Sequence, residues 1–452
     1  MAGQPGAAFR AGDGPFPDAA EVSRPITNGR VLRIAAPIVL ANATVPLLGA
    51  VNTGVVGQLG QAAPIGAVGI GAVILASVYW IFGFLRMGTS GLVAQAHGAG
   101  DTGERAAILI RALVVAGVAG LALVALQGPV VWGAFRLAPA SAEVEALSRQ
   151  YLAIRIWGAP ATIALYAVTG WLIAVERTRA VLAVQLWMNG LNVALDLWFV
   201  LGLGWGVPGV AVATLIAEWS GLAVGLWLCR DGLSGAAGVL AVGPLRRMLA
   251  VNTDIMIRSV CLQASFTTFL FLGAAQGDVR LAANQVLLQF LEITAYALDG
   301  FAFAAETLVG QAVGARSRPG VRRAAVVASQ WGVGGAVALA AVFLAAGPAI
   351  IDLMATAPEV RAAARDYLPW LVAAPLIGVA SWMLDGVFIG ATMTRDMRNA
   401  MFVSVLVYGV ALAALVPVFG NHGLWAALMV LNAVRGITMA LRYPRVEARL
   451  SE

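Results

Sequence analysis

Three carboxylates share one face of a stretch that is otherwise apolar. The segment Leu281–Arg316 is hydrophobic enough to lie in a bilayer, yet it carries Glu292, Asp299 and Glu306 at intervals of seven residues. On a helix this spacing gives one slightly drifting stripe. A carboxylate in hydrocarbon costs about 2.5–3.5 kcal/mol on insertion scales, so each acid must face protein or water. The spacing predicts a polar cavity with ionisable walls; the alternative is that one or two acids cap a helix end or lie among lipid headgroups.

Two more acids stand in other apolar stretches. Asp196 lies one helical turn after Asn192 in NGLNVALDLWFV, and Asp385 lies in MLDGVFIG. A desolvated carboxyl close to a cationic substrate makes the proton and the cation compete for one place, which is the core of an antiport cycle. We expect Asp196 to be this coupling acid. The alternative is a carboxylate that is hydrogen-bonded to the backbone or to a neighbouring amide at a kink.

The acids of the second half could also bind a metal cation. Asp299, Glu306 and Asp385 could build a sodium site from carboxylate and carbonyl oxygens, with Asp385 and Glu306 as ligands. The alternative is that they pair with arginines inside the membrane, for which Arg86 and Arg155 are the candidates.

Two other side-chain pairs have competing interpretations. Tyr296, one turn before Asp299, could stack against a flat organic cation, although aromatic residues near helix ends are more often interfacial anchors. Asp254 and Arg258 stand at i and i+4, and we expect them to neutralise each other on one helix.

No motif for catalysis or nucleotide hydrolysis is present. The chain has no H-E-x-x-H, no paired-carboxylate motif and no G-x-x-x-x-G-K-[ST] phosphate loop. An integral-membrane enzyme is therefore disfavoured. We expect no cofactor and no ATP motor within the chain, and an ion gradient as the energy source.

The composition is typical of a membrane protein with many spans. Hydrophobic residues make up 60% and charged residues 12%, with a mean hydropathy of +0.85, whereas soluble domains carry roughly a quarter charged residues. At about 20 residues per span, the 452 residues hold on the order of twelve helices. The apolar runs are continuous rather than alternating, which excludes a β-barrel.

Twelve apolar runs, bounded by turn residues or charges, predict the helices. They are Val31–Leu59, Ile65–Gly98, Glu104–Phe135, Ala142–Val175, Arg179–Leu203, Pro208–Cys229, Leu245–Ala275, Leu281–Ala315, Val321–Ala346, Glu359–Thr392, Arg395–Phe419 and Gly423–Leu441. The predicted organisation is a cytoplasmic tail (1–30), an amino-terminal six-helix lobe (31–229), a cytoplasmic link (230–244), a carboxy-terminal six-helix lobe (245–441) and a second cytoplasmic tail (442–452).

The distribution of arginine predicts how these helices are oriented in the membrane. All basic residues except the two histidines are arginine, and they gather in the tails and in every second link, as in the RSRPGVRR run Arg316–Arg323. The links Gly60–Pro64, Gly204–Val207 and Gly420–His422 contain none. Positive residues favour the cytoplasmic side, so both termini are predicted to be cytoplasmic, which requires an even number of spans. The net charge of +6 therefore indicates membrane orientation and not nucleic-acid binding.

The two halves of the chain repeat each other. GLVAQAHGAG (Gly91–Gly100) aligns with TLVGQAVGAR (Thr307–Arg316), and the same offset of 216 residues takes Gly170 to Gly386 and Arg179 to Arg395. One offset that holds across separate blocks indicates duplication. Equivalent points are six spans apart, so the copies share an orientation, and we expect a pseudo-two-fold axis along the membrane normal with a cavity between the lobes.

Several blocks resemble the multidrug and toxic compound extrusion (MATE) family, most closely its DinF branch. They include AAPIVLANATVPLLGAVNTGVVG, FGFLRMGTSGLVAQAHGAG, LNVALDLWFVLGLGWGVPGVAVAT, AYALDGFAFAAETLVGQAVGAR and MLDGVFIGATMTRDMRN, and they run almost from end to end. The resemblance implies an antiporter of two six-helix lobes that expels organic, often cationic compounds in exchange for protons or sodium.

The resemblance also implies roles for individual residues. Asp196 and Asn192 match a polar pair that lines the amino-terminal pocket, Pro37 matches a proline where the first helix bends, and Asp385 matches an acid implicated in cation binding in the related NorM branch. One position departs from the family, which usually reads VDT where this chain has Val-Asn52-Thr. Asparagine cannot titrate, so either other acids carry the coupling or the chain is a variant, natural or engineered, with weakened coupling.

The sequence thus predicts an efflux antiporter of the bacterial cytoplasmic (inner) membrane. Its partners would be the lipid bilayer and small organic cationic or amphipathic substrates, with no nucleic acid, and a two-lobed transporter can function as a monomer. The alternative is a flippase for a lipid-linked precursor, which needs a basic cavity for diphosphate. The sign of charge in the cavity discriminates between the two.

Overall fold

The computed structural model describes residues 25–58, 61–137, 141–236 and 238–450, and all regular structure in these ranges is helical. The predicted tail 1–30 falls mostly outside the described residues, and so do residues 451–452. Twelve helical units in the described part are long and apolar enough to cross a membrane. The predicted all-α membrane fold is therefore confirmed.

The first six units form the amino-terminal lobe. They are α2 (Asn28–Gly57), α3 with α4 (Ala62–Ile81, Phe84–Gly98), α5 (Thr102–Ala125), α7 with α8 (Ala142–Arg155, Ala159–Ala174), α9 (Thr178–Asp196) extended by the π-helical turn η2 (Leu197–Gly202), and α10 (Gly206–Leu228). Shorter elements in this half are α6 (Gln127–Leu137) and the 3-10 turns η1 (Ile156–Gly158) and η3 (Arg230–Leu233).

The other six units form the carboxy-terminal lobe. They are α11 (Val242–Ala274), α12 (Asp278–Gly314), α13 (Arg318–Met354), α14 (Pro358–Gly390), α15 (Thr394–Phe419), and α16 (Asn421–Arg442) with the short α17 (Pro444–Ala448). The predicted helix centres all fall within these units.

Local polar residues explain where several helices begin. Asp101 accepts a hydrogen bond from the backbone N–H of Glu104 at 2.8 Å before α5, and Ser317 accepts one from Gly320 at 3.2 Å before α13. Ser141 caps α7 in the same way. Such caps satisfy N–H groups that have no partner within the helix.

Several predicted boundaries differ from the structure, including one division and one extension. The run Glu104–Phe135 is divided into α5 and α6, and Pro129 lies in the first turn of α6, where the missing N–H of proline does no harm. The run predicted to end at Ala346 continues as α13 to Met354, across Pro348. Spanning helices tolerate such a proline because neighbouring helices and local adjustments satisfy the freed backbone groups.

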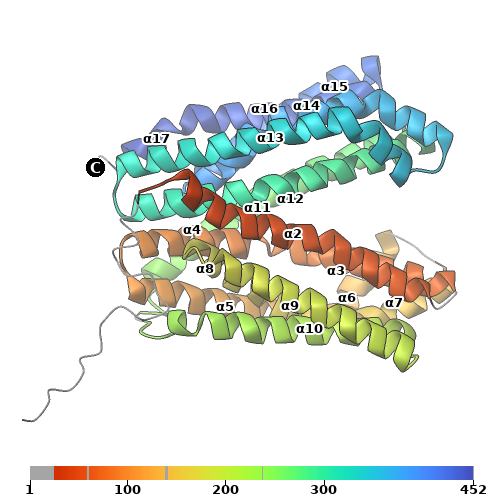
Figure 1. The fold of residues 1–452 in the computed structure, drawn as a ribbon, viewed down its shortest axis with the longest axis horizontal. Coiled ribbons are helices and arrows are strands. Elements are labelled where there is room, and N and C mark those ends of the chain that lie inside the picture. The colour runs from red at the N-terminus through yellow and green to blue at the C-terminus, as the bar shows by residue number, and fades with distance from the viewer. Residues whose placement is uncertain (1–24, 59–60, 138–140, 237, 451–452) are drawn as a thin grey trace, which may run out of the picture.

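The spanning helices alternate in direction along one bundle axis. In Figure 1 most amino-terminal helices occupy the lower part of the view and most carboxy-terminal helices the upper part, with α2 between them. The end where α2 begins and α16 ends is called the terminal end here, and the opposite end is called the distal end. Helix α12 joins the lobes, because it packs on α13 and α14 of its own lobe and on α2 and α4 of the other.

Candidate functional site

The amino-terminal lobe contains a buried polar cluster around Asp196. Helix α9 places Asn192 and Asp196 one turn apart, and both side chains are buried, while α2 contributes the half-buried Asn52. With amide orientation assigned from the hydrogen-bond network, Asn52 Nδ2 donates to Asp196 Oδ2 at 2.9 Å and to Asn192 Oδ1 at 3.1 Å. The fold therefore brings together three residues that the sequence predicts for one pocket.

Hydroxyl groups from neighbouring helices complete this cluster. Asn192 Nδ2 donates to Thr214 Oγ1 of α10 at 3.0 Å. Asn189, almost one turn earlier in α9, donates to Thr44 Oγ1 of α2 at 2.8 Å. These bonds fix the amides, so the orientation of the groups around Asp196 is set by three helices.

One oxygen of Asp196 is left without a partner. Its Oδ1 atom is buried and accepts no hydrogen bond from the described residues. A buried, unsatisfied polar atom is unfavourable and calls for an explanation. Asp196 also stands where α9 changes to the wider turn η2, a local geometry that occurs frequently at functional sites. A free carboxyl oxygen at such a place can take up and release a proton.

In the carboxy-terminal lobe, Asp385 lies between two arginines. Arg258 of α11 donates to Asp385 Oδ2, and Arg435 of α16 donates to the same oxygen at 3.3 Å. All three side chains are buried. The carboxylate charge is therefore neutralised by guanidinium groups that come from two other helices.

Glu306 and Asp299 lie in α12 near a third arginine. The Arg86 guanidinium is 3.6 Å from Glu306, which is buried, and packs 3.8 Å from the centre of the Phe303 ring. Asp299 is only half-buried, two turns nearer the distal end. Glu306 thus lies beside a membrane arginine, as the alternative to a sodium site predicts.

Two predicted ion pairs have other partners. The prediction that Asp254 and Arg258 neutralise each other is wrong, because Asp254 pairs with Arg398 at 2.6 Å while Arg258 binds Asp385. Spacing within one helix gave no information on partners in α14 and α15. Arg155 forms a bidentate ion pair with Glu218, at 2.6 and 2.8 Å, and not with an acid of the other lobe.

A cavity of about 660 Å³ lies between the lobes toward the distal end. Its lining comes from α3, α11 and α12: Ala76, Ser77, Trp80, Ile81, Val260, Gln263, Ala264, Thr267, Thr268, Phe271 and Glu292. Among these lining residues Glu292 is the one charged group. The stripe of three acids on α12 therefore runs from an exposed acid in the cavity to a buried one near the terminal end.

The remaining predicted site residues lie at the contact of α2 with α12. Pro37 is buried inside α2, which runs as one helix past it. Asn42 of α2 donates to the backbone oxygen of Tyr296 at 3.2 Å, and the Tyr296 side chain is half-buried. In the part of the chain that the structure describes, no three His, Cys, Asp or Glu residues form a group suited to a metal.

The lobes meet closely at the terminal end. Gln95 of α4 donates to the backbone oxygen of Gly390 at 2.8 Å, and Gln311 of α12 donates to that of Ala174 at 3.0 Å. Each glutamine therefore binds the last turn of a helix in the opposite lobe. Gln95 also accepts from Arg247 at 2.7 Å and Gln311 from Arg30 at 2.7 Å.

Comparison with known proteins places this geometry in a family. The MatE family model matches residues 37–198 and 255–415. The chain belongs to the MatE family. The two matched segments fall one in each lobe, in agreement with the repeat. Escherichia coli (strain K12) DNA damage-inducible protein F is 40% identical over 426 residues, which is 91% of each chain.

Solved structures of MatE-like transporters have the same fold. A multidrug resistance MATE family transporter of the MOP superfamily, in an outward-facing conformation, gives a TM-score of 0.86 at 18% identity, covering 97% of this chain and 99% of that one. A MOP superfamily transporter from Pyrococcus furiosus, described as having a binding pocket of reverse polarity, gives 0.86 at 19% identity with the same coverage. The MatE chain is thus a multi-pass membrane protein from a family of multidrug efflux transporters, not of enzymes.

Several residues of the site were missed in the sequence. Thr214, Glu218 and Arg435 belong to helices whose patterns do not mark them. Gln95 and Gln311 are different, because they occupy the same place in the repeated blocks GLVAQAHGAG and TLVGQAVGAR. A polar residue retained in both copies of an apolar repeat was an available signal for a shared contact.

Proposed function

We propose that this MatE protein is a secondary active antiporter that exports organic, often cationic compounds across the bacterial cytoplasmic membrane in exchange for protons. One observation carries the proposal. The buried carboxyl group of Asp196 has one oxygen held by the amide of Asn52 and one oxygen without a partner among the described residues, which suits a group that gains and loses a proton.

The amide of Asn52 can meet both protonation states of Asp196. When the carboxylate is ionised, Asn52 Nδ2 donates to Oδ2 across 2.9 Å. When Oδ2 carries the proton, the amide turns end for end and its oxygen accepts from the same place. Asn52 would therefore support the exchange without titrating, and coupling does not require the aspartate that the family usually has there.

Protons are favoured over sodium by the surroundings of the other acids. The sodium site that the sequence suggests at Asp385 and Glu306 would put a cation beside Arg258, Arg435 and Arg86, which already neutralise these carboxylates. Like charges at such distances repel. The side chains bonded in the cluster around Asp196 are amides and a hydroxyl, and Arg155, whose charge also acts on Asp196, is already paired with Glu218.

The cavity lining favours a cationic substrate over the flippase alternative. Glu292 supplies negative charge, and Trp80 and Phe271 supply aromatic surface suited to an organic cation. A diphosphate headgroup would need basic residues, and none lines this cavity among the described residues. The substrate would then favour one conformational state of the protein and the proton another. This difference is what lets the proton gradient drive export of the substrate.

Alternating access would come from relative motion of the lobes. The glutamine contacts close the terminal end, while the cavity lies toward the distal end. Arginine-rich links lie at the terminal end, so we place that end in the cytoplasm, and the described state would be open to the outside. Each chain holds both lobes and both polar clusters, so a monomer would suffice.

Transport by reconstituted protein tests this function. We would measure uptake of a fluorescent organic cation into proteoliposomes under an imposed proton or sodium gradient. The proton gradient is expected to drive uptake, Asp196→Asn to abolish it, and the matched control Asp366→Asn, at an exposed site on α14, to leave it intact. Uptake driven by sodium alone, with Asp196→Asn fully active, would refute the proposal.

A further inference from the structure

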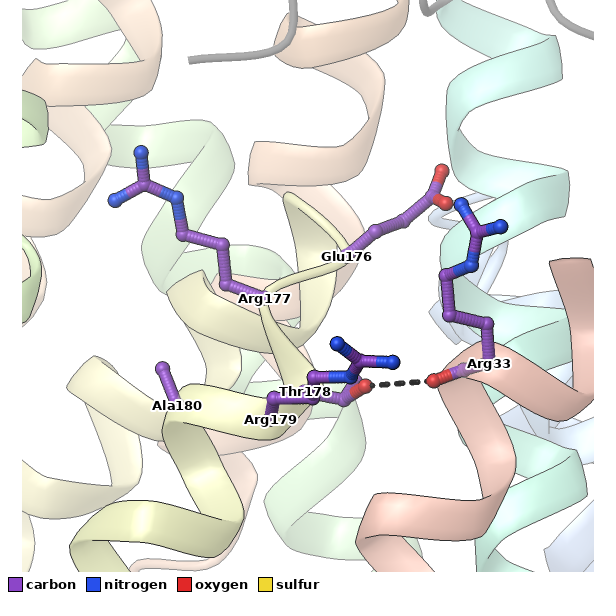
Figure 2. Close-up of a pocket in the computed structure, with 6 residues that line it drawn as sticks. All are labelled: Arg33, Glu176, Arg177, Thr178, Arg179 and Ala180. Carbon is purple, nitrogen blue, oxygen red and sulfur yellow. Dashed lines mark hydrogen bonds between the residues drawn. The ribbon is translucent and has the colours of Figure 1, made fainter. Parts of the chain in front are cut away.

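The terminal end carries a basic pocket between α2 and α9. The cavity is about 510 Å³ in volume and is lined by Arg33, Glu176, Arg177, Thr178, Arg179 and Ala180. Figure 2 shows Arg33 of α2 and Arg179 at the start of α9 on one side of the pocket, while the side chain of Arg177, just before α9, extends to the other side. Thr178 Oγ1 donates to the backbone oxygen of Arg33 at 3.1 Å, which holds the two helices together at the pocket.

The charges of this pocket do not cancel. Glu176 is held by Arg30, with Nη2 at 2.5 Å and Nε at 3.1 Å from the carboxylate. Arg177 donates to the backbone oxygen of Leu228 and lies 4.0 Å from Asp231. Arg33 and Arg179 are exposed, and neither forms an ion pair or a side-chain hydrogen bond with the described residues. Two guanidinium groups therefore remain available to an anion.

The pocket borders an apolar helix face. Leu186 lies seven residues after Arg179 in α9, so the two side chains share one face of the helix about 10 Å apart. Leu186 and the adjacent Trp187 are 52% and 50% exposed. In a protein that spans a membrane, such exposed side chains face acyl chains. A ligand that fills the pocket and also covers this face has an anionic head and an apolar tail.

We propose that this pocket binds the phosphate headgroup of an anionic phospholipid, whose acyl chains lie along α9. Arginine pairs with phosphate oxygens through two parallel hydrogen bonds, and basic pockets between spanning helices on the cytoplasmic side are suited to acidic lipid headgroups. The bound lipid sits next to the Arg30–Glu176 pair, which in turn holds Gln311, so it stabilises the closed terminal end.

The repeat supplies an internal control. At the same offset of 216 residues, Arg179 corresponds to Arg395 and Arg33 corresponds to Leu249. Arg395 is exposed like Arg179, but the second lobe has no partner arginine at the position of Arg33. The lipid site therefore belongs to the amino-terminal lobe alone.

Lipid binding to the full chain in detergent tests the proposal. Native mass spectrometry and thermal unfolding would compare phosphatidylglycerol, phosphatidylcholine of equal chain length, and inorganic phosphate. We expect phosphatidylglycerol to bind in preference and to raise the unfolding temperature. Arg33→Gln and Arg179→Gln should each weaken its binding about fivefold, and Arg395→Gln should have no effect. All three residues are exposed, so the variants should fold.

Three results would overturn the lipid site. One is equal binding of phosphatidylglycerol and phosphatidylcholine. Another is equal weakening by Arg395→Gln, which would indicate a diffuse surface charge. A third is stabilisation by inorganic phosphate alone as large as that by the lipid, which would assign the pocket to a soluble anion. None of these results bears on coupling at Asp196.

Discussion

Gln95 and Gln311 occupy equivalent positions in the two halves of this MatE protein, and each binds the helix end that is equivalent in the other half. Gln95 donates to the oxygen of Gly390, and Gln311 to that of Ala174, which is again 216 residues from Gly390. The pseudo-two-fold axis that the repeat predicts would exchange these two contacts. These contacts hold the terminal end shut.

Removing either glutamine should loosen the terminal end. Gln95→Ala or Gln311→Ala leaves the carbonyl oxygen of Gly390 or Ala174 without its donor and removes one hydrogen bond of Arg247 or Arg30, which costs about 1–3 kcal/mol of the closed state. Spin labels at the equivalent exposed positions Thr102 and Arg318 would measure the opening. We expect a longer-distance population in either variant and an unchanged distribution in Gln150→Ala, an exposed control.

Two glycines near these glutamines should be intolerant of a methyl group. A Cβ at Gly98 would collide with the backbone oxygen of Gln311, and a Cβ at Gly314 with that of Gln95. Gly98→Ala and Gly314→Ala are expected to disfavour the closed terminal end, measured with the same labels. Gly117→Ala and Gly334→Ala, where a Cβ meets nothing within 4 Å, are the controls. Closure as complete as in the natural chain would show that the lobes need not approach so closely.

Replacing Asp385 should lower the stability of the protein, because this residue pairs with buried arginines. Asp385→Asn leaves Arg258 and Arg435 buried without their carboxylate, and breaking a buried pair in this way costs about 3–5 kcal/mol. Thermal unfolding should show a clear loss of stability, part of which the double variant Asp385→Asn/Arg258→Gln recovers. A fully stable Asp385→Asn that loses sodium-dependent transport would instead favour the sodium site.

Restoring an acid at position 52 should change how many protons the pocket holds. Two carboxylates within 3 Å of each other share a proton, and Asn52 lies at that distance from Asp196. We expect Asn52→Asp to transport and to hold one more proton than the unaltered chain at neutral pH, where an unpaired carboxyl is ionised. Asn189→Asp is the matched control two turns away. Proton uptake that is equal in Asn52→Asp and Asn189→Asp would show that a carboxyl at position 52 does not pair with Asp196.

Glu292 should make the cavity bind cationic compounds in preference to neutral ones. Glu292→Gln removes the one charged group among the residues that line it, and the lost attraction of about 1 kcal/mol corresponds to about fivefold weaker binding of a cation. Equilibrium binding would compare a cationic compound with a neutral compound of the same shape. Equal weakening of both would mean that Glu292 acts on the shape of the cavity.

The sequence predicts this fold well because its signals are local or periodic. Apolar runs, arginine-rich links and the repeated blocks depend on neighbouring residues or on one constant offset, and they predict twelve helices in two lobes. Partners across helices are different. Nothing near Asp254 indicates Arg398, and nothing near Asp385 indicates Arg435, because side chains far apart in the chain meet only after the helices pack.

The most direct test of the account is proton release on substrate binding. Purified protein in a weakly buffered solution would be mixed with a saturating organic cation, with the number of protons released per chain recorded alongside binding. The account predicts about one proton for the natural chain and none for Asp196→Asn, which should still bind the cation. Equal proton release from both proteins would contradict the assignment of coupling to Asp196.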